Sequence, residues 1–268
     1  MKEWFNRLKV SQKLALICVF FVMPDSLMLY FFITGINANI RFAKLEKMGN
    51  EYQRPLEELL ELIPQHGALA AAPAADDPVW RERLAAKQAQ IDAAFSELRA
   101  VDERLGGALQ FTPEGLAKHK RAHYDARTVR GEWWALRDHL GQLPPEVCAE
   151  RHLHLVADLR TMISHAGDMS NLILDPQLDS YYLVDVTLLA LPQTQDRLAA
   201  VMTLGGATLL RQTVSPPERQ QLATDATLLK EDDLDRITDS LHTSLNANPD
   251  FYGGSASLQA RVPPAFKA

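Results

Sequence analysis

The sequence predicts an all-α protein in which one membrane-spanning helix continues into antiparallel helical bundles. Three observations predict this fold class: an apolar run at residues 14–36, apolar residues recurring every three or four positions beyond it, and cap residues with proline or glycine between those stretches. The 268 residues carry a formal net charge of −6. This mild acidity argues against a nucleic-acid binder, which usually has a basic face.

The apolar run reads LALICVFFVMPDSLMLYFFITGI. As a helix it extends roughly 35 Å, more than the ~30 Å hydrocarbon core of a bilayer. No A-x-A-like cleavage site follows, so the run predicts an uncleaved signal anchor. A buried core helix of a soluble protein is the alternative. The positive-inside rule places residues 1–13 in the cytoplasm because basic residues gather ahead of the run: Lys2, Arg7, Lys9 and Lys13.

Asp25 lies near the centre of the predicted span, where a carboxylate costs roughly 2.5–3.5 kcal/mol. Two interpretations are open. Asp25 makes a polar contact across a helix–helix interface in a dimer, or it is a neutral carboxyl that hydrogen-bonds its own helix near a kink at Pro24.

Beyond the span, residues 37–252 show helical periodicity and no convincing strand. The expected helices cover 42–66, 78–105, 113–140, 146–173, 177–211 and 216–248, with Pro55 and Pro192 as expected kinks. Asp77-Pro78, Thr112-Pro113, Asp175-Pro176 and Ser215-Pro216 supply the start signals. Short capped connections favour up-and-down antiparallel packing, and we expect two stacked four-helix-type bundles. Residues 253–268 are expected to be a loop or the start of a further element.

No motif of an enzyme, a cofactor site or a metal site is found, so we expect no catalysis, no cofactor and no metal. His119 and His123 have a spacing of four on one expected helix but no obvious third ligand. His152 and His154 are two positions apart and point to different faces. The two cysteines, Cys18 and Cys148, are expected in different compartments, so no intrachain disulfide is predicted.

A group of arginines is the candidate ligand site. Arg121, Arg127 and Arg130 share the expected helix 113–140 with Tyr124. Guanidinium groups bind carboxylates with two parallel hydrogen bonds, so these residues would suit an organic anion. The alternative is a solvated charged face paired with Asp125 and Glu132.

Two stretches carry a resemblance to a known family. Residues 49–56 read GNEYQRPL and are followed by leucines and Pro64-Gln65-His66; residues 170–185 read SNLILDPQLDSYYLVD. The first resembles the helix after the first membrane span of methyl-accepting chemotaxis proteins. The second resembles the D-P-x-L-D-S-Y-Y-L segment of the same receptors and of related sensor histidine kinases. The architecture is similar to helical bimodular sensing domains.

The resemblance implies a homodimeric receptor in a bacterial inner membrane, with residues 37–252 in the periplasm sensing a small molecule. Its partners would be the lipid bilayer, the ligand and cytoplasmic chemotaxis signalling proteins. Tyr181 and Tyr182 would line a pocket or brace the bundle core. We expect the chain to be a fragment that stops before its output region. Two alternatives stay open: the sensing half of a histidine kinase or diguanylate cyclase, and a structural membrane-tethered helical protein.

Overall fold

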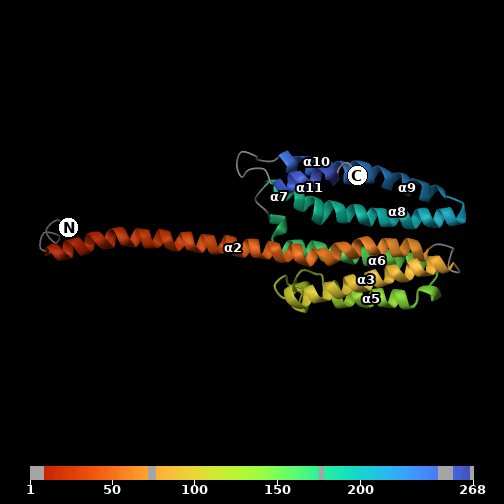
Figure 1. Cartoon of the computed structure of the whole chain (residues 1–268), viewed down its shortest axis with the longest axis horizontal. Coiled ribbons are helices and arrows are strands. Elements are labelled where there is room, and N and C mark those ends of the chain that lie inside the picture. Colours follow the sequence, from red (N-terminus) through yellow and green to blue (C-terminus); the bar gives the residue numbers. More distant parts are fainter. Residues whose placement is uncertain (1–8, 72–76, 175–177, 247–255, 266–268) are drawn as a thin grey trace. The chain divides into compact units, whose positions relative to one another are not determined.

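The computed structural model describes residues 9–71, 77–174, 178–246 and 256–265. All regular structure in those residues is helical, which confirms the predicted all-α class (Figure 1). The chain divides into two compact units, Met1–Lys44 and Leu45–Ala268.

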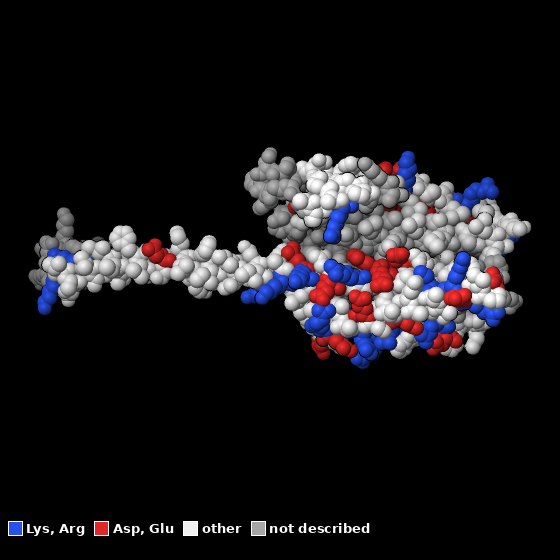
Figure 2. Space-filling view, viewed as in Figure 1, with Lys and Arg blue, Asp and Glu red and all other residues white. Residues whose placement is uncertain are grey.

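The apolar run lies in helix α2, Val10–Ala70. This helix is long and apolar enough to cross a membrane. None of its most apolar 18-residue window is buried, whereas the core helix of a soluble protein would bury such side chains. Figure 2 shows most of this part of the helix free of Lys, Arg, Asp and Glu. Asp25 is exposed here, and neither of its two interpretations is tested.

The first group of helices in unit 2 comprises the C-terminal half of α2, α3 (Pro78–Leu105), the short α4 (Pro113–Lys118), α5 (Ala126–Asp138) and α6 (Pro145–Met169). The helices begin where the sequence places caps. The side chain of Asp77 accepts from the backbone N–H of Val79, and that of Thr112 accepts from Gly115. In this group the apolar stripes of α2, α3, α5 and α6 form one buried core, which includes Tyr52, Leu56, Leu59, Ile63, Ile91, Leu98, Trp133, Leu155, Leu159 and Met162.

Side-chain pairs show that α2 and α3 run antiparallel. Tyr52 pairs with Asp102 near the start of the contact, and Gln65 pairs with Lys87 near its end. As the residue number rises along α2, it falls along α3. This matches the up-and-down packing expected from short, capped connections.

The expected helix 113–140 is wrong as a single element. Helix α4 ends at Lys118, and α5 begins at Ala126. Lys120 adopts a left-handed φ of 58°, and the Asp125 side chain accepts from the N–H groups of Arg127 and Thr128. A left-handed residue ends a helix, and an N-cap aspartate starts a new one, so local capping overrides the apolar periodicity.

The second group begins with α7 (Leu178–Val184), a π-helical turn Asp185–Ala190 and α8 (Leu191–Arg211). A kink was expected at Pro192. The π-helical turn lies directly before that proline, which cannot donate a backbone hydrogen bond. The start signal Asp175-Pro176 lies outside the described residues.

After α8 come α9 (Pro216–Leu228), a second π-helical turn Leu229–Leu234, α10 (Asp235–Asn246) and α11 (Ala256–Ala265). Ser215 and Glu218 form the predicted capping box. Helix α10 packs on α7, and α8 packs on α6 of the first group. The arrangement as two stacked four-helix bundles stays a prediction. Short 3-10 turns lie at Leu140–Gln142 and Leu172–Leu174.

Gly49 allows the close approach of α2 to the end of α6. A Cβ atom there would lie 2.2 Å from Ser170 Oγ and 2.9 Å from Leu172 Cδ1. We expect Gly49→Ala to lower the free energy of unfolding by about 1–3 kcal/mol, because the two helices must separate. Urea unfolding of the full chain in detergent micelles, followed by circular dichroism, measures this.

The matched control is Gly131→Ala in α5, where a Cβ atom meets nothing within 4 Å. Alanine should raise stability there by up to about 1 kcal/mol through its helix propensity. Equal stability of the two variants would contradict the close contact at Gly49.

Candidate functional site

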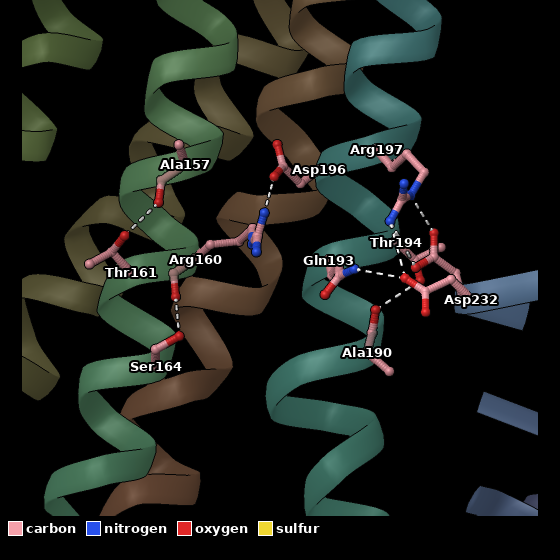
Figure 3. A network of polar contacts seen from close by, with 11 residues as sticks. Ala157, Arg160, Thr161, Ser164, Ala190, Gln193, Thr194, Asp196, Arg197 and Asp232 are labelled. Carbon is pink, nitrogen blue, oxygen red and sulfur yellow. Dashed lines mark hydrogen bonds and ion pairs between the residues drawn. The ribbon is translucent and has the colours of Figure 1, made fainter. Parts of the chain in front are cut away.

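A polar cavity of about 370 Å³ lies between α6 and α8. Helix α6 contributes Arg160, and α8 contributes Gln193, Asp196, Arg197 and Ala200. Asp196 and Arg197 follow Gln193 by three and four positions, and Ala200 follows Asp196 by four, so these side chains lie on one side of α8. Figure 3 shows this network, with Arg160 reaching from α6 to Asp196.

The two arginines of the cavity are held differently. Arg197 Nε donates to Asp233 Oδ2 at 2.7 Å, and Asp233 is only 2% exposed. Arg160 pairs with Asp196, and these two side chains are 37% and 28% exposed. A partly exposed ion pair contributes little to stability, so a ligand can replace one of its members at low cost. Arg160 therefore suits an incoming carboxylate, and Asp196 suits a cationic group of the same ligand.

A second cavity of about 390 Å³ lies between α2 and the start of α8. Its α2 wall is acidic, and its other wall comes from the π-helical turn and α8; the lining residues are Arg54, Glu57, Glu58, Glu61, Thr187, Leu191, Pro192 and Gln195. Burial raises the pKa of Glu57, and Arg54 opposes this shift. Residues of α2 and of the segment from Thr187 to Gln195 thus face one cavity.

The structure separates the arginines that the sequence grouped. Arg121 lies in the connection between α4 and α5, where its Nη1 donates to Asp168 Oδ2 at 2.7 Å and lies 3.3 Å from His165 Nδ1. Arg127 is exposed, and the guanidinium of Arg130 lies 4.1 Å over the Trp134 ring. Of these three arginines, Arg127 and Arg130 share helix α5, whereas Arg121, expected on the same helix, lies before it.

The aromatic candidates lie in two different groups of helices. Tyr124 packs partly buried against the core of the first group. Tyr181 and Tyr182 lie on α7, with their rings edge to face at 5.5 Å. Neither lines the two cavities described above. A ligand-binding role for these tyrosines and for the three arginines stays a prediction.

Potential metal ligands meet at a place that the sequence did not indicate. His119 and His123, expected one turn apart on a helix, lie at the end of α4 and in the connection to α5. Instead, Glu132 of α5 and His154 and Asp158 of α6 bring three ligand atoms within 4.8 Å of one another. Burial, opposed by His154, raises the pKa of Asp158 to about 6. Sequence spacing could show the His154–Asp158 pair but not the approach of Glu132.

Two histidines that the sequence left unassigned form a buried chain of hydrogen bonds. His152 Nδ1 lies 2.7 Å from the carbonyl of Cys148, so it donates and leaves Nε2 as an acceptor. His66 Nδ1 lies 2.8 Å from that Nε2 and therefore donates to it. Gln88 Nε2 then donates to His66 Nε2 at 3.3 Å. In this arrangement each of the two rings carries one proton.

This chain favours neutral histidines. Burial, followed by the proximity of His152, lowers the pKa of His66 to about 3, and burial lowers the pKa of His152. An unfolded histidine has a pKa of about 6.5, so between pH ~6.5 and ~3 the unfolded chain binds more protons. Stability is therefore complete above this window and falls as the pH drops through it.

We expect the stability advantage of the wild type over His66→Gln to shrink by about 1.4 kcal/mol per pH unit on acidification below pH ~6.5. Urea unfolding of both full chains in detergent micelles at several pH values between 7.5 and 4.5 measures it. Taking the difference cancels other titrating groups, including Asp158. His139→Gln, at an exposed position, is the control. A difference that does not change with pH would contradict the buried neutral pair.

Comparison with known proteins supplies no relative for this chain. No family model, no curated protein and no solved structure matches it. The likeness of residues 49–66 and 170–185 to chemoreceptors therefore rests on those residues alone. The functional conclusion must follow from helix α2 and from the geometry around α6 and α8.

Proposed function

We propose that this chain is the sensing module of a homodimeric transmembrane receptor, most similar to a chemoreceptor. One observation carries the proposal: α2 is a single helix from Val10 to Ala70, so the apolar segment and the buried core of unit 2 share one continuous backbone. A helix that continues from a folded domain into a membrane span is a natural route for a signal. Residues 14–36 would span a bacterial inner membrane, with residues 1–13 in the cytoplasm.

The cavity between α6 and α8 is the site at which we place the ligand. A small molecule with a carboxylate would exchange for Asp196 on Arg160, while Arg197 stays fixed by the buried Asp233. An ammonium or hydroxyl group on the ligand would occupy Asp196. The organic anion expected from the sequence fits this chemistry, at arginines other than those expected.

Helix α8 would transmit a ligand-induced change of its packing to α2. The wall of the second cavity brings Leu191 and Gln195 of α8 opposite Glu57 and Glu61 of α2. A ligand that binds better to one packing of α8 against α6 shifts the population toward that packing. The signal would then pass along α2 to cytoplasmic chemotaxis proteins. A kinase or cyclase output, the first alternative, would use the same geometry.

A thermal-shift screen of the full chain in detergent micelles tests ligand binding. We expect one class among carboxylates, amino acids and amines to raise the unfolding midpoint, with a gain of about 2.7 kcal/mol at one hundred times the dissociation constant. Arg160→Gln should abolish the shift for a carboxylate ligand.

The control is Arg99→Gln, which breaks an exposed ion pair with Glu103 on α3 and should leave the shift intact. A folded chain that responds to no member of the panel would favour the structural, membrane-tethered alternative. A shift that survives Arg160→Gln would place the ligand elsewhere.

Cysteine labelling tests the orientation. In a background with Cys18→Ala and Cys148→Ala, we expect a membrane-impermeant maleimide to label Glu97→Cys on α3 in bacterial spheroplasts. Asn6→Cys should react only after lysis, because the positive-inside rule retains the N-terminus in the cytoplasm. Labelling of both cysteines before lysis would contradict a membrane-spanning α2. The reverse pattern would show that the N-terminus lies outside the cytoplasm.

A further inference from the structure

Helix α6 has a second polar face, which points toward α5. His154 and Asp158 are four residues apart on α6 and therefore lie one turn apart on the same side. Glu132 reaches them from α5. His154 Nε2 lies 3.5 Å from Glu132 Oε2 and 3.5 Å from Asp158 Oδ2. Arg160, which lines the cavity with α8, follows Asp158 by two positions and faces the other way.

Two carboxylates and one imidazole meet in this cluster. Asp158 is only 5% exposed, yet it faces a second carboxylate, that of Glu132. Within the described residues, the one basic side chain that forms an ion pair with either carboxylate is His154. A buried carboxylate beside a second carboxylate is costly unless it takes up a proton or a cation compensates it. This buried side chain points into the group of three ligand atoms.

The spacing of the three side chains fits a small metal ion. An ion with tetrahedral ligands at about 2.0–2.2 Å separates its ligand atoms by about 3.3–3.6 Å. The two measured separations from His154 Nε2, 3.5 Å each, fall inside this interval. They are also too long for good hydrogen bonds, which require about 2.7–3.2 Å. The third pair, between the two carboxylates, lies within 4.8 Å.

We propose that Glu132, His154 and Asp158 bind one divalent transition-metal ion of the Zn²⁺ type between α5 and α6. One imidazole and two carboxylates are a suitable donor set for this class of ion. Three protein ligands leave a coordination position for water or for a further ligand. His123 also acts electrostatically on Asp158. The bound ion would tie α5 to α6 and so stabilise the first group of helices.

Zn²⁺ titration of the full chain tests the proposal. The protein is purified in detergent micelles with a tag that contains no histidine and is dialysed against a chelator. Calorimetry should show one ion per chain, and Zn²⁺ should raise the unfolding midpoint. Co²⁺ bound in the same place should give the visible absorption of a four-coordinate site.

Asp158→Asn and His154→Gln should each weaken Zn²⁺ binding by more than about 100-fold, because even outer-shell changes cost 10–100-fold. His139→Gln removes an exposed histidine at the end of α5 and should keep wild-type affinity. If Asp158→Asn does not fold, Glu132→Gln, at a half-buried position, replaces it. A folded wild type that binds none of Zn²⁺, Co²⁺, Ni²⁺ and Mn²⁺ overturns the proposal, as does wild-type affinity in Asp158→Asn. These results are independent of the carboxylate screen, which concerns the opposite face of α6.

Discussion

The burial of one face of α2 is the constraint on which the first group of helices depends. Leu56, Leu59, Leu60 and Ile63 are fully buried, and each contributes about 1.5–3 kcal/mol through removal of apolar surface from water. Helices α3, α5 and α6 complete the same core. The most apolar part of the same helix is exposed. The side chains of one continuous helix therefore face two different surroundings. Its sequence changes accordingly, from apolar on all sides to apolar on one face.

Buried polar contacts then set the register of α2 against its neighbours. Tyr52 Oη donates to Asp102 Oδ1 at 2.8 Å, and burial raises the pKa of Tyr52 well above its ordinary value. About four turns along, His66 hydrogen-bonds His152 of α6. An axial slide of α2 would break both contacts and leave buried polar atoms unsatisfied. Closely packed helices with such contacts move between discrete arrangements, which is a requirement for transmitting a signal.

Helix α6 contributes side chains to both candidate sites because it packs against α5 and against α8. Toward α5 it presents His154 and Asp158, and toward α8 it presents Arg160. Helix α8 follows a π-helical turn, Asp185–Ala190, in which the backbone hydrogen-bond register changes. Pro192 explains the position of that turn, since a proline cannot continue the normal ladder.

The sequence by itself determined the helical class, the apolar segment, most of the core of the first group and most of the helix starts. These features depend on local physics: side-chain periodicity, proline geometry and the capping of orphan N–H groups. The same reasoning failed at residues 119–125, because Lys120 in a left-handed conformation and the Asp125 cap outweighed the apolar pattern. A left-handed lysine gives no sequence signal, although Asp125 was a recognisable cap.

Only the tertiary structure decided which side chains meet. Arg160 and Asp196, His66 and His152, and Glu132 and Asp158 are 36, 86 and 26 residues apart in sequence (196 − 160, 152 − 66 and 158 − 132). Periodicity places a residue on a face of its own helix, but it does not say which helix that face will contact. Contacts between helices depend on how all the buried faces fill one core, and that is a property of the whole chain.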